Sequence, residues 1–362
     1  MDIDIILEPD ITPAQLAEIA VRAEELGVRA VWSSNYHMMW DGFLSLAPAA
    51  AATSKILLGP LAVSPWEMHP LKMANAVLTL NEMSQGRGMV AVGGGGSLIG
   101  AIGWKTSAEA ETWPTRHPVK GTRFPDRRVR AVRETLDVMK IARKGEICMK
   151  YPGEVFEVNR PFIMDWAEHD GPLLYSCSSG PMMIRMGGQH ADGIQLSDYT
   201  PDMMPMCMEN VQKGMDRREE KPDDFRIGNF WAFHIKKDSE ASYWEARREL
   251  YVRGGIVGAE REQIEKFCHS EEETNWVMDQ RDEFRKAYLW KKGTIDKIPD
   301  ELANRLVNGM ASAGDLSAID REVERYKEFA ASGLTELCLR LHDDPMEGLE
   351  IIGEHIIPAL QQ

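Results

Sequence analysis

The stretch KILLGPLAVSPWEMHPLKMANAVLTLNEMSQGRGMVAVG, residues 55–93, decides the fold. Its first part, residues 55–64, is an apolar run that predicts a β-strand. Residues 69–86 carry apolar side chains at helical spacing and end at a glycine, which predicts a helix. The apolar run 88–93 then predicts another strand. Strands that are apolar along their whole length are typical of a parallel sheet covered by helices on both faces.

The same alternation of strand and helix continues on both sides of this unit. The helix predicted over residues 11–27 has a full set of end signals: Thr12 as N-cap, Pro13 in the first turn, Gln15 completing a capping box, and Gly27 at its end. The remaining strands are predicted at residues 4–7, 29–34, 172–178, 193–198, 225–237 and 334–341.

Eight strands that alternate with helices predict an α/β protein, a (β/α)8 TIM barrel formed by a single domain over residues 1–362. Two stretches interrupt the alternation, and we interpret them as insertions at about 100–125 and 240–330, the second one mostly helical. Residues 146–159 predict a small β-hairpin that turns at Pro152-Gly153. A doubly wound sheet is the main alternative, but it would normally show a Rossmann glycine fingerprint early in the chain, and this sequence has none.

Composition narrows the class of partner. The formal net charge of -15 argues against nucleic acid or an anionic membrane surface, because both attract basic faces. No apolar run approaches the roughly 20 residues that a membrane-spanning helix needs, and the acidic start MDIDIILEPD does not resemble a signal peptide. The 5 cysteines are scattered, as expected for reduced thiols. We therefore expect a cytoplasmic protein that acts on a small molecule.

Four consecutive glycines, residues 93–96, follow the predicted strand 88–93. They do not form a dinucleotide fingerprint, because Ser97 stands where a glycine is required, and Trp104 breaks the nearby resemblance to a phosphate loop. In a barrel, the carboxyl ends of the strands carry the active site. The glycines are therefore interpreted as a binding loop, with a simple turn as the alternative.

A second candidate is SCSSGPMM, residues 176–183. A strand leads into small residues, and Gly180-Pro181 begins a helix. The free N–H groups of that helix start, together with the Ser178 and Ser179 hydroxyls, would form a pocket for an anion such as phosphate. An ordinary capped helix is the alternative.

Two further features fall at strand ends. Gly59-Pro60 within an apolar strand predicts a bulge, because proline removes a donor from the sheet. Asn35, Tyr36 and His37 follow the second strand and place polar groups on the active face. No second histidine or carboxylate lies at ligand spacing from His37, so no metal site is expected.

These segments, in this order, resemble the bacterial luciferase-like superfamily of (β/α)8 flavin and deazaflavin enzymes. Within it, the similarity is greatest to methylenetetrahydromethanopterin reductases and other oxidoreductases that use coenzyme F420. The resemblance is carried by the runs MDIDIILEPD, LAEIAVRAEELGVRAVW, LGPLAVSPWEMHPLKMANAVLTLNEMSQGR and GPMMIRMGGQHADGIQLSD.

The resemblance implies a set of cofactor contacts. A non-prolyl cis peptide that supports the deazaflavin ring would fall at Leu61-Ala62, and Asn35 would hydrogen-bond to the ring. The remaining contacts would be the glycine loop beside the ribityl chain and ring (Gly94, Gly95, Gly96 and Ser97) and the phosphate site (Ser178, Ser179, Gly180, Pro181 and Met182).

Three departures from the family pattern concern the substrate. The histidine that often handles a proton is Tyr36, and the acid that often follows the glycines is Gly96. The glutamate of the methylene-transferring reductases corresponds to Ile6, with Glu8 nearby. These differences bear on the pterin substrate more than on the cofactor.

The resulting hypothesis is a coenzyme F420-dependent oxidoreductase that transfers a hydride between the deazaflavin C5 and an imine, a ketone or an activated alkene. Tyr36 would donate or orient a proton, and His37, Trp40 and Trp66 would shape the substrate side. The resemblance also implies a homodimer. Two alternatives stay open: an FMN-dependent monooxygenase or reductase on the same scaffold, and a barrel that binds a deazaflavin or another ligand without turnover.

Overall fold

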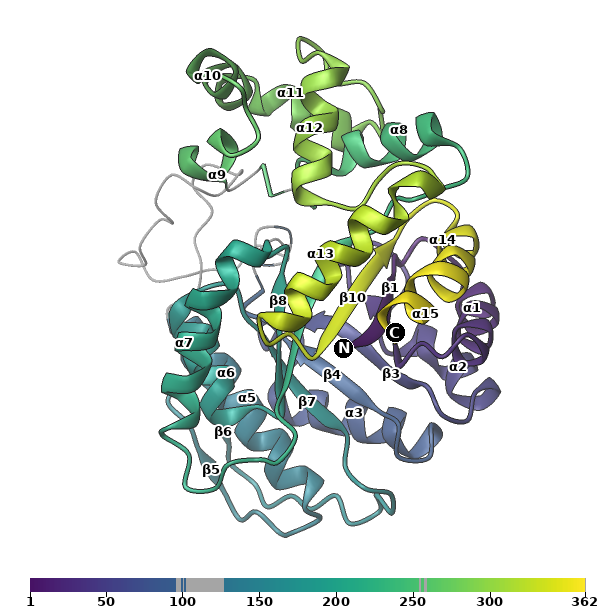
Figure 1. The fold of residues 1–362 in the computed structure, drawn as a ribbon. Coiled ribbons are helices and arrows are strands. Elements are labelled where there is room, and N and C mark those ends of the chain that lie inside the picture. The colour runs from purple at the N-terminus through teal and green to yellow at the C-terminus, as the bar shows by residue number, and fades with distance from the viewer. Residues whose placement is uncertain (96–98, 100, 102–126, 254, 257–258, 362) are drawn as a thin grey trace.

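Eight parallel strands close into a barrel in the order β1-β10-β9-β8-β7-β4-β3-β2 (Figure 1). The computed structural model describes residues 1–95, 99, 101, 127–253, 255–256 and 259–361. The predicted (β/α)8 barrel is thereby confirmed. The barrel strands are β1 (Asp2–Leu7), β2 (Ala30–Ser34), β3 (Leu57–Val63), β4 (Met89–Val92), β7 (Leu173–Cys177), β8 (Gly193–Ser197), β9 (Arg226–Ala232) and β10 (Glu336–Leu341).

Helices cover the outside of the barrel. They are α1 (Pro13–Glu25), α2 (Ala47–Ala52), α3 (Pro70–Met83), α5 (Arg128–Arg143), α6 (Pro181–His190), α7 (Met204–Met215), α13 (Ile319–Ala331), α14 (Pro345–Ile351) and α15 (Ile357–Leu360). Among the helices of the described residues, none combines the length and the apolar character needed to cross a bilayer.

Local signals account for where these elements begin. At α1 the Thr12 hydroxyl accepts a hydrogen bond from Gln15 N at 3.3 Å, while Thr12 N donates to Gln15 Oε1 at 3.0 Å. The predicted capping box is therefore present, and it satisfies N–H groups that the first turn leaves without helical partners. The predicted hairpin is also confirmed, as β5 (Tyr151–Pro152) paired with β6 (Glu157–Val158).

Two layers of apolar side chains hold the barrel together. Inside it, Trp32, Met89, Tyr175 and Phe230 belong to a buried cluster contributed by several strands. Larger clusters fill the space between the strands and the surrounding helices. β3 is irregular: its register against β4 shifts between Leu61 and Val63, as the predicted bulge requires.

A helical insertion lies between β9 and α13 (Figure 1). It comprises α8 (Ser239–Glu249), α9 (Arg261–Glu265), α10 (Glu271–Asp279), α11 (Arg281–Leu289) and α12 (Asp300–Met310). These helices bury their own hydrophobic cluster, which includes Leu250, Phe284 and Leu306.

The insertion is shorter than the predicted range 240–330. Helix α13 packs Val323, Tyr326 and Phe329 into the cluster that surrounds the barrel. Because α13 carries many charged residues, its apolar stripe is not apparent in the sequence, and residues 319–331 were largely predicted to be part of the insertion. Most of the other predicted insertion, 100–125, lies outside the described residues.

Candidate active site

The carboxyl ends of the barrel strands meet at one rim, and the predicted site residues lie there. Asn35 and Tyr36 follow β2, the Leu61-Ala62 peptide lies near the end of β3, and the glycine loop follows β4. The segment Ser178–Met182 follows β7. Four predicted motifs, separated by up to about 145 residues of sequence, are therefore brought to the same end of the barrel.

The Leu61-Ala62 peptide bond is cis, as the resemblance implies. Asn35 binds this segment twice: its backbone N donates to Leu61 O at 2.9 Å, and its side-chain Nδ2 donates to Ala62 O at 3.3 Å. The same Nδ2 donates to Glu67 Oε1 at 3.0 Å. The Asn35 amide thus ties the end of β2 to the end of β3. Its contact with a cofactor ring stays a prediction.

Tyr36 and His37 differ in their surroundings. The Tyr36 hydroxyl accepts a hydrogen bond from the Arg253 guanidinium, and the Arg253 Cζ lies 5.9 Å from the centre of the Tyr36 ring. Arg253 also forms an ion pair with Glu8 at 3.3 Å. His37 is exposed on the segment after Tyr36. Tyr36 is therefore joined to a charged network, and its predicted role with protons stays open to test.

The described part of the glycine loop packs closely on β3. A Cβ at Gly93 would lie 3.1 Å from Ala62 Cβ. Gly95 has a φ of +74°, and a Cβ there would lie 2.4 Å from Ser64 Oγ. These approaches explain why glycine is used, since any larger residue would displace the segment that carries the cis peptide. The predicted contacts Gly96 and Ser97 lie outside the described residues.

Helix α6 begins in the way that the anion pocket requires. Gly180 is its N-cap, no side chain caps the first turn, and a Cβ at Gly180 would meet nothing within 4 Å. Pro181 has no N–H to offer, so the first-turn donors are the N–H groups of Met182 and Met183, which have no partner within the helix. These donors and the helix dipole favour an anion at this point.

The two serines of the pocket are held differently. Ser178 is 2% exposed, and its Oγ lies 3.0 Å from Ser176 Oγ, so its hydroxyl has a partner inside the protein. The Ser179 carbonyl accepts a hydrogen bond from Tyr199 OH at 3.2 Å, which fixes the loop before Gly180. The anion pocket in this structure therefore depends on backbone N–H groups more than on the Ser178 hydroxyl.

The glycine loop and the start of α6 meet at Gly94. A Cβ at Gly94 would lie 3.5 Å from Met183 Cε and 3.9 Å from Arg128 Cβ. Arg128 is the first residue of α5, and burial lowers the pKa of its guanidinium. A negative charge nearby would offset that loss of hydration. Two motifs that the sequence suggested separately thus form one candidate anion site, with the first residue of α5 packed beside it.

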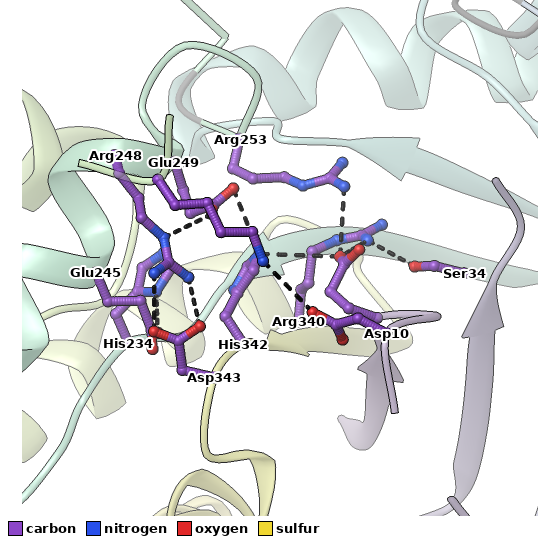
Figure 2. Close-up of polar contacts among 12 residues, drawn as sticks. Asp10, Ser34, His234, Glu245, Arg248, Glu249, Arg253, Arg340, His342 and Asp343 are labelled. Atoms are coloured by element: carbon purple, nitrogen blue, oxygen red, sulfur yellow. Dashed lines mark hydrogen bonds and ion pairs between the residues drawn. The ribbon is translucent and has the colours of Figure 1, made fainter. Parts of the chain in front are cut away.

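A charged network occupies the rim at β1, β2 and β10, and most of its residues were not predicted from the sequence (Figure 2). The Arg340 guanidinium donates to Ser34 Oγ at 2.7 Å and to Glu8 Oε1. Burial alone would raise the pKa of Glu8, but the charges of Arg340 and Arg253 outweigh it and lower that pKa. Glu8 is therefore an ionised carboxylate held between two arginines.

Figure 2 also shows a group of three buried side chains that could hold a metal ion: His234, Glu245 and His342. His234 Nδ1 lies 2.7 Å from Glu245 Oε1, and Lys236 Nζ lies 3.0 Å from Glu245 Oε2. The two histidine rings are stacked with their centres 4.9 Å apart.

The electrostatic surroundings of this group do not favour a divalent cation. Burial, His234 and the arginines 253, 340 and 248 lower the pKa of His342 well below its ordinary value. The same arginines would repel a divalent cation bound at this group, because it also carries positive charge. We therefore interpret the group as a polar network under the insertion.

A simple signal could have found the network. Glu8 directly follows β1, and Arg340 and His342 lie at the end of β10. Polar residues at strand ends were used to select Asn35 and Tyr36, and the same rule applies to these three residues. Arg253 could not be found in this way, because it comes from the insertion.

The comparisons with known proteins concern the family and the fold. Residues 3–336 match the family described as luciferase-like monooxygenase. The 5,10-methylenetetrahydromethanopterin reductase of Archaeoglobus fulgidus is 23% identical over 357 residues, 98% of each chain. The F420-dependent glucose-6-phosphate dehydrogenase of Amycolatopsis mediterranei is 26% identical over 227 residues, 59% of this chain and 62% of the relative.

A solved structure has the same fold. The coenzyme F420 dependent tetrahydromethanopterin reductase from Methanopyrus kandleri superposes with a TM-score of 0.76 at 19% identity, covering 99% of this chain and 100% of that chain. The closed barrel, the rim site and the match over most of the sequence lead to one conclusion. The chain belongs to the luciferase-like monooxygenase family.

Proposed function

We propose that this protein is an oxidoreductase that uses coenzyme F420 to transfer a hydride to or from a small organic substrate. When bound, the coenzyme supplies the carbon, C5, that carries the hydride. The observation that carries the proposal is the meeting of the glycine loop with the N-terminus of α6 at Gly94. Relatives named as F420-dependent, one of them matched over 59% of this chain, support the choice of cofactor.

The residues present fit such a group. The N–H donors at the start of α6 and the open space at Gly180 suit a phosphate, and Arg128 adds positive charge nearby. In this proposal Ser179, Gly180, Pro181 and Met182 hold the phosphate. Leu61, Ala62 and Gly94 border the ring, and Asn35 keeps the β3 segment in place.

The chain's own residues would also set the chemistry of the substrate side. Glu8, Arg253 and Arg340 provide fixed charges at the rim, and Tyr36 adds a hydroxyl. The relatives are named for different substrates, a pterin reductase and a glucose-6-phosphate dehydrogenase, so their names do not identify ours. We propose a ketone, an imine or an activated alkene, whose carbon can accept a hydride.

The test is a fluorescence titration of the purified protein with F420 and, in parallel, with FMN. We expect saturable binding of F420 at lower concentration than FMN. A yellow flavin that copurifies and binds more tightly than F420 would contradict the proposal and favour the FMN enzyme. Tight F420 binding without oxidation of the reduced coenzyme by any of a panel of ketones, imines and enones would favour a barrel that binds without turnover.

The homodimer implied by the resemblance belongs to the same proposal. Light scattering on the purified protein tests it directly. We expect a mass twice that of the 40.8 kDa chain, and the monomer mass would contradict it.

A further inference from the structure

One carboxyl group at the rim has no part in the site described so far. Asp198 directly follows β8, and its backbone N donates to Phe230 O of β9 at 3.1 Å. Its φ of 56° is in the left-handed region, which few residues other than glycine adopt. Such conformations persist where the surrounding structure holds them, often at functional sites. Asp198 is therefore fixed in place at the end of a barrel strand.

The charges that act on Asp198 come from across the rim. Arg253, which follows α8, and Arg340 of β10 both interact electrostatically with its carboxyl group. Both arginines also contact Glu8, which directly follows β1. Asp198 itself is half-buried and directly follows β8, so it lies at the same rim as Glu8.

Two contacts describe the surroundings of Asp198: one joins its own carboxyl group to an exposed residue, and the other joins the neighbouring Tyr199 to the loop of the candidate anion site. Ser197 Oγ, on an exposed residue, donates to Asp198 Oδ2 at 2.8 Å. The next residue, Tyr199, donates from its hydroxyl to Ser179 O in the loop before α6. Burial raises the pKa of Asp198, although Arg253, the Ser197 hydroxyl and Arg340 act in the opposite direction. The group thus keeps its proton to higher pH than an ordinary aspartate.

Hydride transfer to a ketone or an imine needs a proton donor as well as a hydride donor. Tyr36 is the residue predicted for this role, and its hydroxyl accepts a hydrogen bond from Arg253. We propose that the Asp198 carboxyl is the acid that protonates the substrate heteroatom during reduction. This inference rests on the proposed function and adds a second reacting group to it.

The substrate carbon gains a hydride from reduced F420, which is oxidised, and the C=O or C=N π pair moves to the heteroatom. The heteroatom forms a bond to the Asp198 proton as the carboxyl O–H bond breaks. The resulting carboxylate regains a proton from water, by way of the Ser197 hydroxyl. In the oxidation of an alcohol or amine, the same carboxylate would accept the proton.

The test compares the wild type with Asp198→Asn, because asparagine also tolerates the left-handed backbone. Asp216→Asn is the matched control, since Asp216 is an exposed carboxylate at the end of α7. Difference infrared spectroscopy of the cofactor-free proteins, recorded over a pH titration, follows the C=O bands of protonated carboxyl groups. We expect the wild type and the control to share one band that persists to higher pH than that of an ordinary aspartate, and that band alone to be missing in Asp198→Asn. F420 fluorescence titration should give the same affinity in all three.

The pH profile supplies the second readout, with reduced F420 and acetone, cyclohexenone or a cyclic imine. The wild-type kcat should be constant at low pH and fall as the pH rises, because the Asp198 carboxyl then loses its proton. We expect Asp198→Asn to lower the plateau by about 100-fold or more and to abolish the fall. Tyr36→Phe should leave the fall in place.

Three sets of results would overturn the inference in different ways. If Asp198→Asn keeps the wild-type infrared band, or the wild-type plateau and pH profile, the inference fails while the proposed function stands. Loss of the fall in Tyr36→Phe instead would assign the proton to Tyr36. If the wild type does not bind F420, the proposed function fails and the inference fails with it.

Discussion

The sharpest prediction concerns Gly180, the N-cap of α6. Its φ of -133° is extended backbone that any residue adopts, and a side chain there has nothing within 4 Å of its Cβ. Gly180→Asp should therefore fold normally. Aspartate is also a better N-cap than glycine by a few tenths of a kcal/mol, so we expect an unchanged or slightly higher melting temperature.

The same substitution should weaken F420 binding through charge. A carboxylate about 4 Å from a singly charged phosphate costs about 1 kcal/mol in water and about 4 kcal/mol at an effective dielectric constant near 20. Since about 1.4 kcal/mol is a tenfold change in Kd, the dissociation constant should rise by roughly 5-fold to 1,000-fold. Gly180→Asn is the control, because it has the same shape and capping ability without the charge.

The assay is the F420 fluorescence titration at low and high salt, with the melting temperature measured in parallel. We expect Gly180→Asp to bind much more weakly than Gly180→Asn, and the difference to shrink at high salt because exposed charges are screened. The reasoning is refuted if Gly180→Asp keeps the wild-type affinity. Equal losses in both variants would also refute it, since bulk and not charge would then be responsible.

Three further predictions concern stability and are measured by denaturant unfolding. Glu24→Gln should lower the free energy of unfolding by about 1–2 kcal/mol at neutral pH. Partial burial of Glu24 opposes its ionisation, but hydrogen bonds from the backbone N–H groups of residues 54–56 outweigh burial and lower the pKa of Glu24 to about 2. The wild type, but not the variant, should lose this stability as the pH falls from about 4.5 toward 2. Gly95→Ala should cost about 1–2 kcal/mol because of its positive φ and the contact with Ser64, whereas Gly94→Ala should be nearly neutral. Glu8→Gln should cost about 3–5 kcal/mol, because it leaves two buried arginines without their shared carboxylate; a loss below 1 kcal/mol would show that solvent compensates them.

The sequence predicted the elements whose signals are local. The capping box at Thr12 depends on residues three positions apart, and each barrel strand is an apolar run that needs no partner to be recognised. The site motifs found in this way have small residues or proline at strand ends, as in the loop before α6. The Leu61-Ala62 cis peptide was expected from the family resemblance, because neither residue type signals it.

The residues that escaped prediction act through contacts between distant segments. Glu8 is separated by 245 positions from Arg253 and by 332 from Arg340, so only the closed barrel and the docked insertion bring them together. Helix α13 was predicted to be helical but was assigned to the insertion, because charged residues outnumber those of its apolar stripe.

The difference between local and distant signals corresponds to a difference in chemistry between the proposed cofactor side and the proposed substrate side of the rim. An anion is bound by backbone N–H groups, and the glycines that expose the backbone are visible in the sequence at Gly94 and Gly180. In the proposed function, the substrate is recognised by long charged side chains, which reach the mouth of the barrel from β1, β10 and the insertion. Residues of the proposed cofactor side can therefore be predicted from the sequence, whereas residues of the proposed substrate side can be identified only in the folded chain. For this reason the cofactor can be proposed more narrowly than the substrate, and variants at Glu8, Arg253 and Asp198 will inform the substrate most.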